Sequence, residues 1–393
     1  MAEHELNVGL IGYNFMGKAH SQAWRNAALY FDLAAKPTLK VVCGRSRDRV
    51  RDFADRWGWQ EYETDWRRVI DRDDVDVVDI ATPTALHHDI AIAAAQAGKH
   101  IFCEKPFARS VDEAARMLAA AAAAGVTHYV NHNYRRCPAV RLARRLIDDG
   151  KIGRLFHWRG AYLQSWIVDP EFPLTWQLQA ESAGAGPQFD LNSHSVDLAR
   201  YLVGDISTVT SMTARFIAQR PLPSATATAF QRGAQQRERG EVTVEDAALM
   251  LVQFENGALG SFEASRFALG RKNHHTFEIY GSRGALRFNL ERMNELEYFC
   301  GDDSAEAQGF RTILATEPCH DYIAHWWPPG HTIGYEHEFT HAVVDFVDAA
   351  VHRTPIEPNF RDGLACMQVL EAGLRSARSG GHVAIATNAP SSP

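Results

Sequence analysis

A glycine-containing turn between an apolar strand and a helix constrains the fold of this chain more than any other sequence feature. The apolar residues 6–11 lead into the hexapeptide GYNFMG at positions 12–17, and a helix-compatible stretch continues to near Tyr30. In a dinucleotide fingerprint, glycines allow the tight turn and the helix N-terminus holds the pyrophosphate. Asn14 replaces the middle glycine. Because asparagine tolerates left-handed backbone better than most residues, we expect the turn to form.

The residues that follow alternate between short apolar strands and helical runs. Strands are predicted at 39–44, 75–83 and 98–106, and an alanine-rich helix at 85–98. Such alternation is typical of a doubly wound parallel sheet with α/β topology. We therefore predict a dinucleotide-binding Rossmann domain over residues 1–135.

The pattern changes after about residue 150. Strand-rich segments with turn signals between them occupy 153–166, 206–218, 245–267 and 275–290. Consecutive strands joined by short turns favour an antiparallel sheet. We predict a second α+β domain over residues 136–393, built on a large, open, mostly antiparallel sheet, with C-terminal helices that could pack back on the first domain. The polar stretch 218–242 is expected to be an exposed excursion rather than a core element.

Composition narrows the class of protein. The 393 residues and the 46% hydrophobic content suffice for two cores. A formal net charge of −7 offers no basic surface for nucleic acid. We find no apolar stretch of membrane-spanning length and no signal-peptide pattern, so we expect a cytoplasmic protein without a membrane partner. The six cysteines form no CxxC pair, which favours reduced core thiols over disulfides or a zinc site.

Five segments in the expected order give the chain a family resemblance. "GLIGYNFMGKAH", "ATPTALHH", "GKHIFCEKP", "NYRRCPAV" and "FDLNSHSVDLARYLVG" together resemble the glucose-fructose oxidoreductase, inositol dehydrogenase and MocA family. The resemblance covers the whole chain. It implies an NAD(P)-dependent oxidoreductase that transfers hydride between the nicotinamide and a secondary hydroxyl of a sugar, anhydrosugar, polyol or glycoside.

The resemblance also implies a catalytic trio of Lys105, Asp190 and His194. Lys105 follows a short buried strand, at the sheet edge where such folds bind ligands, and would stabilise developing alkoxide charge. His194 would take the hydroxyl proton, since imidazole suits proton transfer near neutrality. Asp190 precedes His194 by four residues, so on one helix both side chains would share a face. We assign Asp190 to substrate binding and orientation of the site.

Further site residues are expected in two groups. The cofactor group is Gly12, Asn14, Phe15, Met16, Gly17, Arg45, Thr82, Pro83, His87 and Glu104. The substrate group is Tyr134, Gln164, Trp166 and Trp176, because aromatic faces and amides suit a sugar ring. Each of the aromatic residues could equally fill a core.

The choice between NAD and NADP depends on the end of the second strand. An acidic residue there would bind the ribose hydroxyls and favour NAD. The chain instead has Gly44, Arg45 and Ser46. Arg45 and Ser46 could accept a 2′-phosphate, although an arginine can also stack on adenine and relatives in this family use NAD. The sequence leaves both cofactors open.

Parts of the sequence also match other functions. His337-Glu338-Phe339-Thr340-His341 matches the zinc protease motif HExxH, but a protease would leave the Rossmann pattern unexplained, and we expect no metal. A non-catalytic NAD(P)-binding sensor is an alternative on the same fold, but Lys105, Asp190 and His194 together argue against it. A cofactor-recycling enzyme that oxidises a sugar to assist glycosidic elimination stays open. The broad outer face of the second sheet predicts a homodimer or homotetramer.

Overall fold

The computed structural model describes residues 5–223 and 238–385. The chain forms two compact units: Met1–Cys137 with Thr316–Ala365, and Pro138–Ala315 with Cys366–Pro393. The division at Cys137 lies close to the boundary expected near residue 135. The segment 316–365 returns to the first unit, and the last crossing falls inside helix α11 (Phe360–Ser379).

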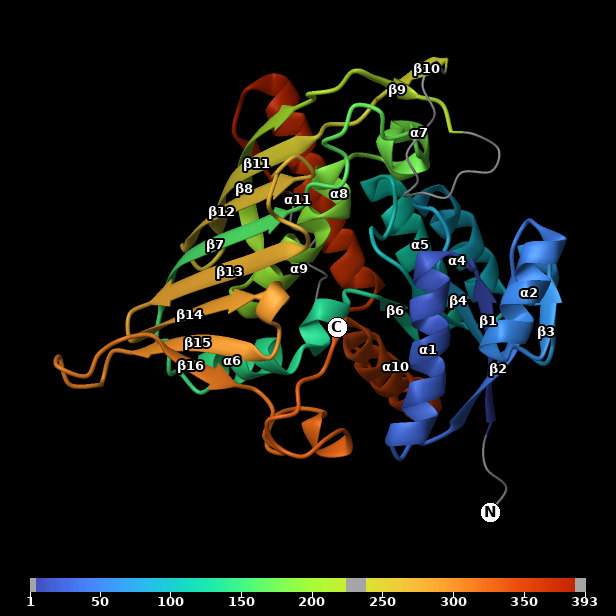
Figure 1. The fold of residues 1–393 in the computed structure, drawn as a ribbon, viewed down its shortest axis with the longest axis horizontal. Coiled ribbons are helices and arrows are strands. Elements are labelled where there is room, and N and C mark those ends of the chain that lie inside the picture. Colours follow the sequence, from blue (N-terminus) through green and yellow to red (C-terminus); the bar gives the residue numbers. More distant parts are fainter. Residues whose placement is uncertain (1–4, 224–237, 386–393) are drawn as a thin grey trace. The chain divides into compact units, whose positions relative to one another are not determined.

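The first unit is built on a six-stranded sheet in the order β3-β2-β1-β4-β5-β6 (Figure 1). Every neighbouring pair in this sheet is parallel. This order confirms the predicted Rossmann sheet. The strands are β1 (Glu5–Ile11), β2 (Lys36–Cys43), β3 (Glu61–Glu63), β4 (Val77–Ile80), β5 (His100–Cys103) and β6 (His128–Val130).

Helices alternate with these strands. α1 packs beside α10, and α4 packs beside α5 (Figure 1). Trp24 of α1 and Phe346 of α10 are both fully buried in the same apolar core, which explains why the C-terminal segment belongs to this unit. The helices are α1 (Phe15–Tyr30), α2 (Arg47–Trp57), α3 (Trp66–Ile70), α4 (His87–Gln96), α5 (Val111–Ala124) and α10 (Tyr335–His352), with short 3-10 turns η1 (Thr84–Leu86), η2 (Asn133–Arg136) and η5 (Ile323–His325).

The second unit is built on a nine-stranded sheet in the order β16-β15-β14-β13-β7-β12-β11-β8-β17. Only the β12–β7 pair in this sheet is parallel, so the predicted mostly antiparallel sheet is confirmed. The strands are β7 (Leu155–Leu163), β8 (Ile206–Ala214), β11 (Ala247–Phe254), β12 (Leu259–Ser265), β13 (His274–Gly281), β14 (Gly284–Asn289), β15 (Glu295–Cys300), β16 (Arg311–Leu314) and β17 (Val383–Ala384).

One face of this sheet carries helices. α6 contacts β14 and β15, α8 contacts β11, and α9 contacts β7 and β12. Residues of β11 alternate accordingly: Met250 and Val252 are buried, whereas Leu249 and Leu251 are 50% and 65% exposed. The helical elements of this unit are α6 (Pro138–Asp148), α7 (Ala180–Ala183), α8 (Pro187–Asp190) and α9 (Asn192–Leu202), with η3 (Trp176–Leu178) and η4 (Leu290–Arg292).

The expectation for residues 218–242 was wrong at both ends of that stretch. β9 (Gln219–Pro221) and β10 (Arg239–Glu241) form an antiparallel pair. Arg220 is fully buried because its guanidinium donates to the carbonyls of Ile167 and Asp169 at 2.5 and 2.9 Å. Residues 224–237 lie outside the described residues.

Candidate functional site

The turn after β1 needs glycine at its first and third fingerprint positions. Gly12 has φ of +111°, and a Cβ there would lie 2.3 Å from the carbonyl oxygen of Ala81. A Cβ on Gly17 would lie 2.3 Å from the carbonyl oxygen of Gly12. Both glycines therefore permit backbone approaches that no side chain would allow.

Asn14 fills the middle position in a way that the sequence did not predict. Its φ is −77°, so its tolerance of left-handed backbone is not used; Gly12 supplies the positive φ instead. Asn14 is the N-cap of α1, and its carbonyl accepts the first helical hydrogen bond from Lys18. Phe15 is 59% exposed and Met16 packs partly against the core. The first turn carries no acidic residue, so its N–H groups suit a phosphate.

The loop after β4 places the next expected cofactor residues. The hydroxyl of Thr82 is buried and has no hydrogen-bond partner within the described residues. Pro83 precedes η1. His87 is buried, with Nδ1 3.1 Å from the Pro106 carbonyl and Nε2 3.1 Å from the Thr82 carbonyl. His87 thus joins the loops after β4 and β5, whereas the Thr82 hydroxyl is suited to form a hydrogen bond with a ligand.

Glu104 and Lys105 follow β5 directly. Glu104 is 3% exposed. Its Oε1 accepts hydrogen bonds from His20 and Asn131. Its Oε2 accepts from the Lys105 backbone N–H at 3.2 Å. Burial alone would raise the pKa of Glu104, but the hydrogen bonds and charges of His20, Lys105 and Asn131 together outweigh it and lower the pKa. The buried Glu104 carboxylate therefore holds the backbone of this loop, whereas the Lys105 side chain is only half-buried.

The end of β2 carries the residues that we expect from the sequence to lie beside the adenosine. A Cβ on Gly44 would lie 1.9 Å from the ring of Tyr13, so the ring can pack against this backbone only because residue 44 is glycine. Arg49 lies over the same ring, 5.6 Å from its centroid. Arg45 is exposed. Together with the glycine turn, the α1 N-terminus and the buried Thr82 hydroxyl, these residues fit a dinucleotide.

Asp190 and His194 lie in the second unit and do not share one helix. α8 ends at Asp190 and α9 begins at Asn192, with Leu191 between them, so the expected continuous helix is interrupted. Asp190 is bound instead by a residue that the sequence did not single out: Arg266 Nη2 donates to Asp190 Oδ2 at 2.7 Å. The side chain of Arg266 is 1% exposed and that of Asp190 is 30% exposed.

Arg266 connects Asp190 to two of the expected substrate residues. Its guanidinium lies 5.3 Å from the ring centroid of Trp166. The Trp166 indole N–H donates to Gln164 Oε1 at 2.8 Å, and Gln164 Nε2 donates to Asn273 at 2.9 Å. The structure thus brings Asp190, Trp166 and Gln164 into one network through Arg266.

His194 lies in an aromatic setting in the same unit. It is 4% exposed, and its ring centroid is 5.9 Å from Tyr162 and 6.2 Å from His275. Tyr162 stacks on His275 at 4.4 Å and donates its hydroxyl to Asn273 at 2.8 Å. Asn273 therefore links the surroundings of His194 to Gln164.

The remaining expected substrate residues are placed separately. Trp176 begins η3 in the second unit and is half-buried. Tyr134 lies in η2 of the first unit and is 3% exposed. Its neighbours Arg135 and Arg136 form ion pairs with Asp362 and Asp345 at 3.4 and 2.8 Å. This stretch thus anchors its own unit through the arginines.

The HExxH segment has a structural role in α10. His341 is buried, its Nδ1 donates to the Arg136 carbonyl at 3.0 Å, and its Nε2 accepts from the Trp326 indole at 2.7 Å. Burial lowers its pKa to about 3. Glu338 is fully buried and accepts from Asn133 at 3.2 Å. Because both nitrogens of His341 are engaged, the segment does not fit a zinc site.

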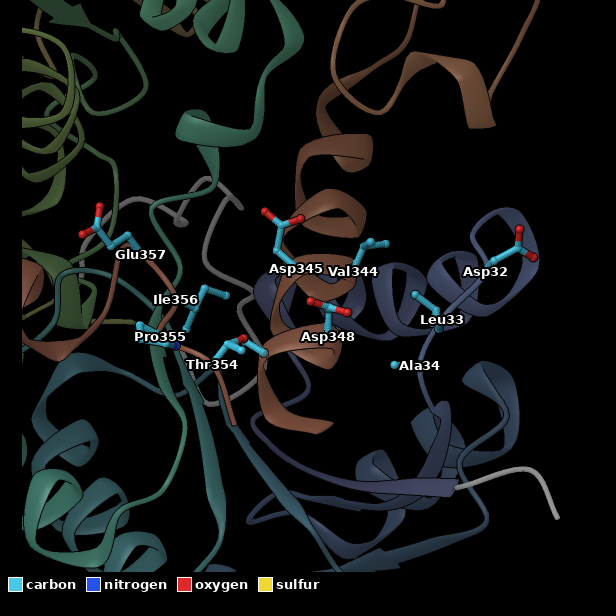
Figure 2. A pocket seen from close by; sticks show the side chains of 11 residues that line it. Asp32, Leu33, Ala34, Val344, Asp345, Asp348, Thr354, Pro355, Ile356 and Glu357 are labelled. Atoms are coloured by element: carbon cyan, nitrogen blue, oxygen red, sulfur yellow. The ribbon is translucent and has the colours of Figure 1, made fainter. Parts of the chain in front are cut away.

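An acidic pocket lies beside the same helix in the first unit. Figure 2 shows Asp32, Asp345, Asp348 and Glu357 around it. Asp345 accepts from the Tyr322 hydroxyl at 2.9 Å, besides its ion pair with Arg136. Asp348 faces His352 at 3.1 Å. The pocket contains none of the expected cofactor or substrate residues.

Comparison with known proteins decides the family. Residues 6–132 match the model described as "Oxidoreductase family, NAD-binding Rossmann fold", and residues 140–287 match the GFO/IDH/MocA C-terminal domain. The chain belongs to the GFO/IDH/MocA family. Its first unit therefore contains the NAD-binding Rossmann domain of this family, as the sequence predicted.

Several family members are similar along nearly the whole chain. Levoglucosan dehydrogenase of Pseudarthrobacter phenanthrenivorans is 44% identical over 95% of this chain and 96% of its own length. The crystal structure of an oxidoreductase domain protein from Kribbella flavida is 50% identical, with a TM-score of 0.92 over 98% of this chain and 100% of that one. A levoglucosan dehydrogenase complexed with NADH and levoglucosan is 42% identical, with a TM-score of 0.92 over 97% and 100% of the two chains.

The residues matched by the two family models include some of the features described above and exclude others. Asp190, His194 and Arg266 lie within residues 140–287, whereas the HExxH segment lies outside both family ranges. No helix among residues 5–223 and 238–385 is long and apolar enough to cross a membrane.

Proposed function

We propose that this enzyme oxidises a secondary hydroxyl group of a sugar, anhydrosugar, polyol or glycoside and uses NAD as hydride acceptor. The supporting observation is the whole-length similarity to levoglucosan dehydrogenase, whose complex holds NADH and levoglucosan. The presence of Lys105, Asp190 and His194 adds the groups that alcohol oxidation requires. An anhydrosugar is the first substrate to test.

The proposed mechanism divides the work among these three side chains. When bound, the nicotinamide supplies the hydride acceptor. His194 takes the proton from the substrate hydroxyl, and the Lys105 ammonium stabilises the negative charge that develops on the same oxygen. Asp190 orients the substrate, and Arg266 fixes the Asp190 carboxylate through their 2.7 Å hydrogen bond. Gln164, Trp166 and Trp176 are proposed to contact the sugar ring.

The cofactor proposal uses residues of the first unit. The N-terminus of α1 and the turn from Gly12 to Gly17 would hold the pyrophosphate. The Thr82 hydroxyl, which has no hydrogen-bond partner among the described residues, would bind the cofactor at the end of β4. Arg45 would lie at the adenosine end, where its exposed guanidinium permits stacking on adenine. Two proteins similar to this chain support NAD rather than NADP as the cofactor: a levoglucosan dehydrogenase solved with NADH and a scyllo-inositol 2-dehydrogenase named for NAD(+).

We further propose a cytoplasmic homodimer or homotetramer. The exposed leucines of β11 and the neighbouring Met212 of β8, 73% exposed, support assembly through the outer face of the sheet. The cysteines are thiols in the residues that the structure describes, which supports a reducing compartment. Carbohydrate is the proposed small-molecule partner.

A substrate panel tests this function. Levoglucosan, inositols and simple hexoses are each incubated with NAD or NADP, and NADH or NADPH formation is followed. We expect net NADH formation with at least one of these substrates. Product elimination without net NADH would instead indicate cofactor-recycling chemistry, and cofactor binding without any turnover would indicate a sensor.

The His194→Ala variant tests the proposed base. Loss of a general base costs roughly 100- to 10,000-fold in rate, so kcat should fall by that amount while NADH affinity changes little. His352→Ala is the matched control, because this histidine is exposed on α10. Near-normal turnover of His194→Ala across the active pH range would move the base role to another group.

A further inference from the structure

A buried cluster of charged side chains lies beneath the loop that carries Lys105. His20 of α1 has Nδ1 2.8 and 3.0 Å from the two carboxylate oxygens of Asp79 in β4, and Nε2 3.0 Å from Glu104 Oε1. His20, Asp79 and Glu104 are 1%, 0% and 3% exposed. Buried charges are costly unless they are paired, so this arrangement requires a physical explanation.

Neutral groups complete the cluster on both sides. The Trp24 indole N–H donates to Asp79 Oδ2 at 2.7 Å, and Asn131 Nδ2 donates to Glu104 Oε1 at 2.6 Å. Glu104 Oε2 accepts the Lys105 backbone N–H at 3.2 Å. The cluster thus runs from the helix behind the glycine turn to the backbone of the proposed catalytic lysine.

The geometry determines the protonation of His20. An ionised carboxylate can only accept hydrogen bonds, so a ring with a carboxylate at each nitrogen must donate from both. Phe102 and Phe339 pack against the ring, and among the described residues the charged groups that contact it are Asp79 and Glu104. Burial alone would lower the pKa of His20, but the two carboxylates outweigh it and raise the pKa to about 10.

We propose that His20 is a positioning residue of the active site, a buried imidazolium that ties α1 to Glu104 and thereby fixes the backbone of Lys105. The role assigned to Lys105 rests on the proposed function. His20 itself touches neither substrate nor cofactor in this proposal. It offsets one of two buried carboxylate charges, so its removal leaves Asp79 and Glu104 with no cation between them.

Apolar packing alone does not explain a histidine here. Position 20 belongs to the buried stripe of α1 with Gly17, Ser21 and Trp24. Apolar side chains at positions 20, 79 and 104 together would avoid the desolvation of three ionisable groups, and buried ion pairs are weak contributors to stability. The charge is instead explained by the hydrogen-bonded path from His20 through Glu104 to the Lys105 N–H.

The charge state is tested first, without any substrate. The full-length protein is labelled with ¹⁵N-histidine, and His20 is assigned by loss of its signals in His20→Gln. We expect both ring nitrogens of His20 to be protonated at pH 8, where an ordinary imidazole is neutral. A neutral His20 ring at pH 8 would overturn the proposal.

Stability against pH gives a second readout. The folded pKa of His20 lies above the unfolded value of 6.5, so its contribution is complete below about pH 6.5 and is lost as pH rises towards 10. Denaturant unfolding of the wild type should therefore show stability falling between pH 7 and 10, and His20→Gln should show a flatter dependence. Parallel curves for the two proteins would contradict the proposal.

Turnover tests the positioning itself. A small displacement of a reacting group can cost about 100-fold, so we expect kcat of His20→Gln to fall by about that factor. His341→Gln is the matched control: it also removes a buried histidine of the first unit, but one bonded to the neutral Trp326 indole and the Arg136 carbonyl. Its kcat should stay near that of the wild type.

A second substitution separates charge from packing. Asp79→Asn in the His20→Gln background restores the net charge of the cluster, and we expect it to recover kcat at least about tenfold, as coupled charges do. Absence of recovery in a folded double variant would overturn the proposal. If wild-type protein oxidises no carbohydrate, the proposed function fails, while the NMR and stability readouts still decide the state of His20.

Discussion

Arg266 is the residue through which Asp190 and Trp166, two of the proposed site residues, are connected. Its guanidinium binds Asp190 at 2.7 Å and lies 5.3 Å from the Trp166 ring, and its side chain is 1% exposed. A hydrogen bond to a charged group is worth about 1.5–3 kcal/mol. Arg266→Met should therefore lower kcat/KM by roughly 10- to 100-fold.

Arg266→Lys refines this test. Lysine keeps the charge but lacks the planar fork that contacts Asp190 and Trp166, so we expect an intermediate loss that appears mainly in KM. Arg271→Met serves as the control because Arg271 is exposed in the following loop. Steady-state kinetics on the best substrate of the panel gives the values. Unchanged KM in Arg266→Met would show that Asp190 is oriented by other groups.

The alternation of β12 could have identified Arg266 in advance. Every second residue of β12 is buried, namely Gly260, Phe262 and Ala264. Arg266, one residue past the end of the strand, continues this alternation and is also buried. An arginine on the buried side of a strand is rare unless it has a charged partner. The partner could not be predicted, because the contact with Asp190 joins residues 76 positions apart. Likewise, His20 lies on a recognisable buried helix stripe, but only the sheet order brings Asp79 and Glu104 to it.

Among the elements, the turn from β1 to α1 is the most tightly specified. Gly12 combines φ of +111° with a would-be Cβ contact of 2.3 Å to the Ala81 carbonyl. Gly58, the C-cap of α2, has φ of +78°, but its Cβ would meet nothing within 4 Å. Gly58→Ala should therefore lower the free energy of unfolding by about 1–2 kcal/mol, because only the left-handed backbone disfavours a residue with a Cβ there.

Gly12→Ala should cost clearly more than Gly58→Ala, because the backbone of β1 or of the Ala81 loop must also shift. We expect NADH binding, measured by fluorescence titration, to be lost in Gly12→Ala and retained in Gly58→Ala. Thermal unfolding of both variants measures the stability difference. Equal losses in the two variants would show that the close approach to Ala81 is not essential.

The sequence predicted β1, β2, β4 and β5 of the first sheet but not β3 and β6, and it predicted one helix through Asp190 and His194 where the structure has α8 and α9. The strand at 39–44 matches β2 (Lys36–Cys43), and the helix predicted to end near Tyr30 matches α1. Periodicity and the glycine turn determine these elements locally. The break between α8 and α9 was missed because Asp190, at its edge, is held by Arg266 just past the end of β12, a tertiary contact that no local pattern encodes.

At the scale of the whole molecule, the outer face of the nine-stranded sheet is the feature that most needs a partner. In the register of the sheet, Leu249 pairs with Met212, and Leu251 pairs with Thr210, so these side chains form one patch. Leu249, Leu251 and Met212 are 50%, 65% and 73% exposed. Adjacent exposed apolar side chains mark an interaction surface, and the proposed second copy of the chain would cover it symmetrically.

Leu251→Asp tests this assembly. A charge at the centre of the patch would be buried without a counter-ion in a symmetric dimer, so we expect the variant to sediment as a smaller species than the wild type at micromolar concentration. Leu269→Asp is the matched control, since Leu269 is 78% exposed and lies outside the strands. Its assembly state should equal that of the wild type. A wild-type monomer, or an unchanged assembly in Leu251→Asp, would remove this face as the contact between copies.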